Sequence, residues 1–273
     1  MPDINNSLLT LAELCIKCAD PAEKCALTDE VYGRLQSGEL NLDENKLPAP
    51  IGEPGRPPRP HLVEPRELPR RRLGTAEGRA TLLHALAHIE FNAINLAWDA
   101  VYRFRGLPAE YYRDWSRVAH EESLHFRLLC ERLGDLGYVY GEFDAHNGLW
   151  EMACKTAHDP LVRMALVPRV LEARGLDVTP GILKRLQQAG DNAAVKVLEI
   201  ILRDEIGHVE IGSRWYRYLC EQRGQDPEAT FAGLLEEFVP GQIRKPFHYE
   251  ARLKAGFNDK EMQYLEKLGA SRD

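Results

Sequence analysis

Apolar residues recur at helical spacing along most of the chain beyond residue 74. Four long helices are predicted, over residues 75–105, 108–137, 159–175 and 191–224. Thr75 and Asp191 are suitable capping residues for the first and the last of these helices. The spacing is not that of strands, so the pattern predicts an all-α fold.

Shorter elements lie before, between and after the long helices. Short helices are predicted over residues 7–16, 30–35, 179–189 and 227–238, with a last one beginning near Asn258. Pro168 interrupts the third long helix one turn before Glu172, and because proline removes an amide donor we expect a kink or bulge there. Residues 138–157 break the helical pattern with Gly141, Asp144, Asn147 and Gly148, and they are expected to form a long crossover connection between the second and third long helices.

The first 73 residues differ from the rest of the chain. Residues 47–69 are rich in proline and lack helical periodicity, so they should be extended. Their leucine and valine content favours an arm docked on the main body, and a mobile linker is the alternative. Three parts are therefore predicted: an N-terminal Pro-rich arm (1–73), a four-helix bundle (74–224) and a C-terminal helical extension (225–273).

Composition and charge exclude some classes of protein. With 273 residues and 44% hydrophobic residues, the chain can bury a sizeable core in one large or two ordinary domains. It has no apolar run long enough to span a membrane and no secretory signal, so a cytoplasmic location is expected. The net charge of -7 argues against nucleic-acid binding through a general positive field. The run Arg70–Arg72 could contact a phosphate or an acidic partner, but a solvated or internally paired stretch is favoured.

Two Glu-x-x-His tetrads are the strongest chemical signal. Each lies in a predicted long helix, where residues three apart share a face and can reach the same ion. Each tetrad is preceded, at a nearly equal distance, by a lone glutamate in an apolar run. The six candidate metal ligands are Glu90, Glu122, His125, Glu172, Glu205 and His208. One tetrad would be expected by chance, but two in matching contexts predict a site.

Charge balance and ligand chemistry indicate which metals to expect. Burying an ionised carboxylate without a partner costs on the order of several kcal/mol, so four clustered carboxylates require cations. Two divalent ions would balance them, while the neutral imidazoles add ligand atoms without charge. Oxygen and nitrogen ligands without thiolate favour two irons, with a manganese and iron pair as the alternative. Glu121 and Asp204, which precede the tetrads, are candidate acceptors for the remaining imidazole N–H groups.

The ligand pattern resembles that of the ferritin-like di-metal carboxylate proteins, whose four-helix bundles take Glu from two helices and Glu-x-x-His from the other two. This resemblance covers about residues 75–224. The stretches His88–Glu90, Leu171–Asp177 and Arg203–His208 are also similar to the bacterial family DUF455, which is distantly similar to tRNA-modifying di-iron hydroxylases. The resemblance implies a ferritin-like bundle and a di-metal site formed by the six candidate ligands, but no settled substrate.

The leading functional hypothesis is an enzyme, a di-iron oxidoreductase that activates dioxygen to hydroxylate or oxidise an organic substrate. Its expected partners are dioxygen, a small-molecule or modified-nucleoside substrate and an electron-donor protein. No membrane or nucleic-acid partner is expected, and the protein should be a monomer or dimer. Two alternatives stay open, namely ferritin-like iron oxidation and storage, and a metal-stabilised scaffold without catalytic activity.

Other polar and aromatic residues have simpler explanations. His84 and His88 lie one turn apart, but His88 is turned about 160° from Glu90 around the helix, so both histidines are expected to make ordinary hydrogen bonds. The tyrosines and tryptophans of the helices are expected to pack in the core instead of relaying electrons.

Overall fold

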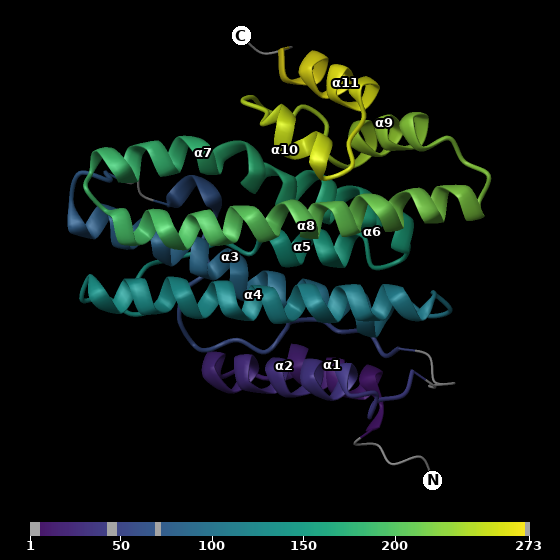
Figure 1. The fold of residues 1–273 in the computed structure, drawn as a ribbon, viewed down its shortest axis with the longest axis horizontal. Helices are drawn as coiled ribbons and strands as arrows, with labels where there is room; N and C mark the ends of the chain where they lie inside the picture. Colours follow the sequence, from purple (N-terminus) through teal and green to yellow (C-terminus); the bar gives the residue numbers. More distant parts are fainter. Residues whose placement is uncertain (1–5, 43–47, 69–71, 271–273) are drawn as a thin grey trace. The chain divides into compact units, whose positions relative to one another are not determined.

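The computed structural model describes residues 6–42, 48–68 and 72–270, and in those residues the fold is all-α (Figure 1). The chain divides into two compact units, Met1–Cys154 and Lys155–Asp273. The boundary falls within the connection predicted between the second and third long helices. The all-α fold class is confirmed. The ferritin-like arrangement of four helices and the division into arm, bundle and extension stay predictions.

Two long helices joined by a short connection form the centre of the first unit. They are α3 (Ala76–Arg103) and α4 (Ala109–Asp135), close to the predicted ranges, and they pack along one another (Figure 1). Thr75 Oγ1 caps α3 by accepting a hydrogen bond from the Gly78 amide, 3.0 Å away. Gly106, with φ of 72°, allows the chain to turn between the helices. Because α3 buries residues on nearly all of its sides, it is the central helix of this unit.

The N-terminal helices pack on that pair. They are α1 (Leu8–Lys17) and α2 (Pro21–Gln36), with α1 against α3 and α2 against α4. Buried polar contacts join α2 to α3: Lys24 Nζ donates to Asn95 Oδ1 at 2.6 Å, and Trp98 Nε1 donates to Thr28 Oγ1 at 3.0 Å. The docked interpretation of these helices therefore agrees with the structure.

The second N-terminal helix is longer than predicted, since it begins at Pro21 and not near residue 30. Asp20 Oδ1 accepts a hydrogen bond from the Glu23 amide at 2.9 Å, which satisfies one of the unpaired donors of the first turn. Proline at the first helical position has the backbone angle that a helix start requires. This start signal outweighs the weak apolar periodicity of the sequence that follows it.

The described part of the proline-rich segment is extended apart from a short 3₁₀ helix, η2 (Pro65–Glu67). It lies on the first unit and is not a free linker: the Gly55 amide donates to the carbonyl of Ile16 at 2.8 Å, and Trp150 Nε1 donates to the carbonyl of Gly52 at 2.7 Å. A Cβ at position 55 would lie 2.1 Å from a backbone oxygen of α1, so only glycine allows this approach. Most of the predicted arginine run, residues 70 and 71, lies outside the described residues.

The predicted crossover connection contains a helix that the sequence analysis missed, α5 (Gly148–Lys155). It is only two turns long and starts at glycine, so it carries few of the usual start signals. Trp150, Met152 and Ala153 are buried on one of its faces. Burial of this face explains how so short a helix is stabilised despite its weak local sequence.

The second unit contains a helix interrupted by a π segment. The consecutive elements are α6 (Pro160–Leu166), the π-helix η3 (Val167–Glu172) and α7 (Ala173–Gln188). The bulge predicted at Pro168 is confirmed. The predicted end of this helix at Gly175 is wrong, because the helix continues through Thr179 and Pro180 without a break. Local breaker residues are outweighed here by the packing of α7 on α8, which buries Leu176 and other residues.

The helix after α7 is α8 (Asn192–Gln222), which lies alongside it (Figure 1). Its predicted cap is confirmed, since Asp191 Oδ1 accepts a hydrogen bond from the Ala194 amide at 3.0 Å. The last helices are α9 (Pro227–Phe238), α10 (Tyr249–Lys254) and α11 (Asp259–Ala270). Of these, α10 was not predicted. Among the described residues, no helix combines the length and apolar character needed to cross a membrane.

Candidate metal centre

Three predicted ligands come together in the first unit. Glu90 lies on α3, and Glu122 and His125 lie one turn apart on α4. His125 Nδ1 is 3.3 Å from Glu122 Oε2 and 3.9 Å from Glu90 Oε2. One ligand atom from each of the three residues lies within 4.8 Å of the others, and all three side chains are buried. These residues form a Glu/His cluster that could hold a metal ion, and we call it the first half-site.

The first half-site occupies positions that apolar side chains would normally fill. One turn from Glu90 on α3, Ala87 and Ile94 are buried, and one turn from Glu122 on α4, Val118 and Phe126 are buried. Residues one turn apart share a helix face, so both carboxylates point into the core of the unit. Two ionised carboxylates this close repel one another, and a bound cation would offset that repulsion.

Glu205 and His208 have a matching geometry on α8 in the second unit. His208 Nδ1 lies 3.4 Å from Glu205 Oε1, and the His208 side chain is buried while that of Glu205 is 12% exposed. Ile201 and Val209, on the same helix face, are buried as well. We call Glu205, His208 and Glu172 the second half-site.

Glu172 is the last residue of the π segment η3. This segment packs against α8, the helix that carries Glu205 and His208, so the ligands predicted for the second unit come from adjacent elements. π-Bulges within α-helices occur frequently at functional sites. The convergence of all six predicted ligands on one point stays a prediction, because three of them belong to each unit.

The comparisons with known proteins identify the family. The family described as "Protein of unknown function (DUF455)" matches residues 17–263. The chain belongs to the DUF455 family. A relative from Haemophilus influenzae, described as "Uncharacterized protein", is 47% identical over 266 residues, which span 94% of this chain and 92% of the relative. No solved structure matches the chain. The predicted similarity to DUF455 is confirmed.

Gly212 is a residue of the DUF455 chain whose role the sequence analysis missed. A Cβ at this position would lie 2.3 Å from the side chain of Pro168, so glycine is what allows α8 to approach the π segment. Gly212 follows His208 by one turn on the same face of the predicted helix. A small residue one turn after a predicted ligand, on the same apolar face, was the available signal for this close approach.

The two histidines set aside in the sequence analysis make ordinary hydrogen bonds, as predicted. His84 Nε2 accepts a hydrogen bond from the Gly141 amide at 2.9 Å, and His88 Nδ1 lies 2.8 Å from Tyr140 Oη. Burial, reinforced by the neighbouring His84, lowers the pKa of His88 to about 4, so its ring is neutral near pH 7. Both rings hold the connection that follows α4 against α3. Beside His88 this connection and α3 also line a small pocket that includes Asn92.

The acids that precede the two tetrads, Glu121 and Asp204, are predicted to accept the remaining imidazole N–H groups. Asp204 accepts hydrogen bonds from the exposed Arg203 guanidinium at 2.8 and 3.1 Å. The roles of Asp204 and Glu121 as acceptors for the imidazole N–H groups stay predictions.

Proposed function

We propose that the two half-sites form one di-metal centre and that this DUF455 protein is an oxidoreductase that uses dioxygen on an organic substrate. The observation that carries the proposal is the buried Glu90, Glu122 and His125 cluster, whose ligand atoms are close enough to share one ion. The matching pair on α8, with His208 Nδ1 3.4 Å from Glu205 Oε1, supplies the same ligand types for a second ion. The donor set of oxygen and nitrogen atoms suits iron or manganese.

The four carboxylates of the two half-sites would balance the charge of two divalent ions, and the two imidazoles would bind in their neutral form. When bound, the metal pair supplies the redox chemistry, and we expect two irons or a manganese and iron pair. The side chains would hold and orient the ions, and the burial of Glu90, Glu122, His125 and His208 would limit the access of competing water. Glutamate suits this role because its two oxygens can bind one ion or bridge two.

The proposed reaction is a hydroxylation or a related oxidation. In a hydroxylation, one atom of dioxygen enters the substrate as a hydroxyl group and the other leaves as water, with two electrons and two protons supplied by an electron donor. The substrate is a small molecule or a modified nucleoside, and the donor is a separate protein. The resemblance of the sequence to tRNA-modifying di-iron hydroxylases, described above, is the reason for proposing this class of reaction.

The first experiment measures metal binding. Protein purified without added metal is analysed for iron and manganese, and the metal-free protein is then titrated with ferrous iron under anaerobic conditions. We expect two ions per chain, with reduced binding in Glu122→Gln and in Glu205→Gln. Glu131→Gln, a change at an exposed position of α4, is the matched control and should bind like the wild type. Binding that is unaffected by both ligand variants would overturn the proposal.

The second experiment asks whether the ions form a pair and react with dioxygen. Manganese-loaded protein is examined by electron paramagnetic resonance, because two ions that share carboxylates are magnetically coupled whereas ions in separate half-sites are not. Ferrous protein is then exposed to dioxygen, and we expect an oxidised iron chromophore that Glu90→Gln diminishes. Metal binding with no dioxygen reaction would favour the scaffold, and a large hollow oligomer that accumulates iron would favour storage.

A further inference from the structure

Glu172 is the last residue of the π segment η3, so contacts that hold this segment also affect the direction of the Glu172 side chain. A π-bulge adds one residue to a turn, and in a helix one residue corresponds to a rotation of about 100°. If η3 relaxed to an α-helix, Glu172 would therefore turn by about that angle relative to the preceding helix. Pro168 has no amide to donate and favours the irregular form, but it cannot by itself fix the side chain of Glu172.

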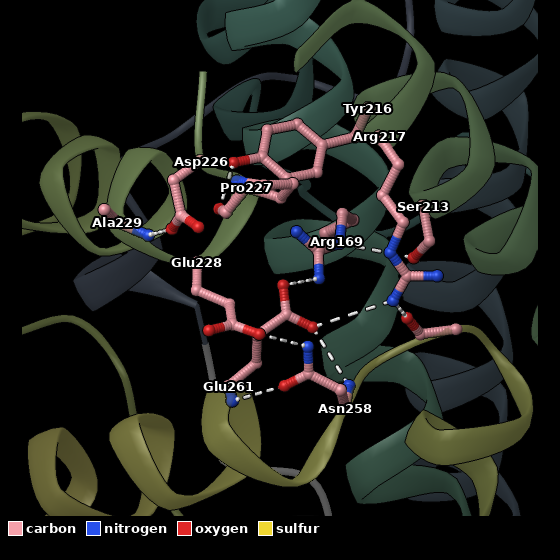
Figure 2. Close-up of polar contacts among 11 residues, drawn as sticks. Arg169, Ser213, Tyr216, Arg217, Asp226, Pro227, Glu228, Ala229, Asn258 and Glu261 are labelled. Atoms are coloured by element: carbon pink, nitrogen blue, oxygen red, sulfur yellow. Dashed lines mark hydrogen bonds and ion pairs between the residues drawn. The ribbon is translucent and has the colours of Figure 1, made fainter. Parts of the chain in front are cut away.

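Arg169, three residues before Glu172, anchors η3 to the C-terminal helices (Figure 2). Its side chain is 1% exposed. Nη2 donates to Glu261 Oε1 on α11 at 2.5 Å, and Nε donates to Ser213 Oγ on α8 at 3.2 Å. The guanidinium also lies over three aromatic rings, those of Tyr216, Phe231 and Phe257, with centroids 4.7, 4.2 and 4.5 Å away. A buried arginine held in this way fixes the backbone that carries it.

Glu261, the partner of Arg169, is itself fixed by hydrogen bonds of its carboxylate and of its backbone amide. Its Oε2 accepts a hydrogen bond from the Asn258 amide at 3.0 Å, while its own amide donates to Asn258 Oδ1 at 2.9 Å (Figure 2). These reciprocal bonds form the start of α11. Arg217 lies 4.0 Å from the same carboxylate and donates to the Gly256 carbonyl. The carboxylate therefore cannot follow Arg169 if η3 shifts, and the pair works as a fixed attachment point.

A second attachment lies on the other side of Glu172. Asp177 on α7 accepts two hydrogen bonds from Arg252 of α10, from Nε at 2.9 Å and from Nη2 at 2.7 Å, and it also accepts from the His248 amide at 2.9 Å. Both side chains of this pair are buried, with Asp177 and Arg252 each 4% exposed. Arg174 adds contacts to the backbone carbonyls of residues 244–246 just before α10. Residues 244–261 therefore contact residues 169–177 on both sides of Glu172, the predicted ligand.

We propose that residues 244–261 act as a splint that positions Glu172 for metal binding, with Arg169 and Asp177 as the two positioning residues that it holds. The proposal rests on the proposed function, because it assigns a purpose to the position of Glu172 in the metal centre. The splint does not touch the metal or the substrate. It acts by keeping η3 in its π form, in which the Glu172 carboxylate would be available to bind an ion together with Glu205 and His208.

The test compares Glu261→Gln and Arg252→Gln with Glu237→Gln, a matched change at an exposed position of α9. Cobalt(II) binding and its visible spectrum report on the ligands, and hydrogen exchange of residues 167–172 in the metal-free protein reports on the bulge. We expect metal affinity to fall by about 10- to 100-fold in the splint variants, as for other contacts that orient metal ligands. Their cobalt spectra should change, and exchange of residues 167–172 should become at least about 10-fold faster while α8 is unaffected. The control should match the wild type.

The outcomes separate the splint from the proposed function. Wild-type protein that binds no cobalt would overturn the proposed function and the splint with it. Wild-type protein that binds two ions while Glu261→Gln and Arg252→Gln keep the wild-type affinity and spectrum would overturn the splint alone. If Glu261→Gln does not fold, Arg252→Lys, which keeps the charge but loses the two-pronged contact with Asp177, provides the same comparison. A variant with lower thermal stability but wild-type cobalt binding would show a structural role only and would also overturn the splint.

Discussion

Lys24 should make the stability of the first unit depend on pH in an unusual direction. Its ammonium group is buried, and it donates to the carbonyls of Cys15 and Ile16 at 2.7 and 3.0 Å and to Asn95 on α3. Burial lowers its pKa from 10.5 to about 8 in the folded protein. Between these values the unfolded chain binds a proton that the folded chain has released, so the free energy of unfolding contributed by Lys24 rises with pH.

The size of this effect follows from the shift. A pKa difference of about 2.5 units between the unfolded and the folded state changes the free energy of unfolding by about 3 kcal/mol over the whole titration. About 2 kcal/mol of this change should appear between about pH 7.5 and about pH 9.5. Buried thiols act in the opposite direction, because burial raises the pKa of Cys15 to about 12 and of Cys130 to about 12, so ionisation of the unfolded chain lowers stability above about pH 9. The measured quantity must therefore be a difference between two proteins.

Urea unfolding of wild type and Lys24→Met, under reducing conditions at both pH values, isolates the contribution of the lysine. The variant loses the hydrogen bonds of the ammonium group, which lowers its stability by a similar amount at each pH. The free energy of unfolding of the wild type minus that of the variant should be about 2 kcal/mol larger at the higher pH. A difference that stays constant, or that shrinks as the pH rises, would refute the argument that Lys24 is buried as a cation with a lowered pKa.

Two further predictions concern packing. Gly212→Ala should lower the free energy of unfolding by about 1 to 3 kcal/mol, because its Cβ would lie 2.3 Å from Pro168. Gly207→Ala on the same helix, where a Cβ meets nothing within 4 Å, should be neutral or stabilising. Both variants are compared with the wild type by thermal denaturation, and an equal loss of stability in the two would contradict this explanation. Thr28→Val should cost about 1 to 3 kcal/mol in urea unfolding, because it leaves Trp98 Nε1 buried without its acceptor, and an unchanged stability would mean that this hydrogen bond contributes nothing.

The sequence was most informative where a local rule and the packing agree. Thr75 and Asp191 cap their helices as predicted, and the loss of an amide donor at Pro168 was enough to predict the bulge. Prediction from the sequence failed where tertiary packing outweighs the local preference of a residue. Gly175 and Pro180 are breakers in isolation, but they lie within α7, whose apolar face is buried against α8.

The features of the candidate site likewise divide into those that the sequence predicts and those that only the folded chain shows. Helical spacing was sufficient to predict that Glu122 and His125 would be adjacent, because both lie on one helix, and the apolar surroundings of Glu90 indicated its burial. Arg169 and Glu261 could not be paired from the sequence. They are 92 residues apart, and only the folded second unit brings α11 onto the π segment. Contacts of this kind depend on tertiary packing, for which a single sequence carries no periodic signal.

The contact between Lys24 and Asn95 has a consequence for the order in which the protein is made. The two residues are 71 positions apart, so α2 leaves the ribosome well before the surface of α3 on which it will pack. At roughly 5 to 20 residues per second, the delay is about 4 to 14 s. During that time Lys24 can reach the carbonyls of Cys15 and Ile16 but not Asn95, and the apolar face of α1 lacks the helix that buries it in the folded protein. Apolar surface exposed in this way promotes aggregation, which chaperones prevent during translation.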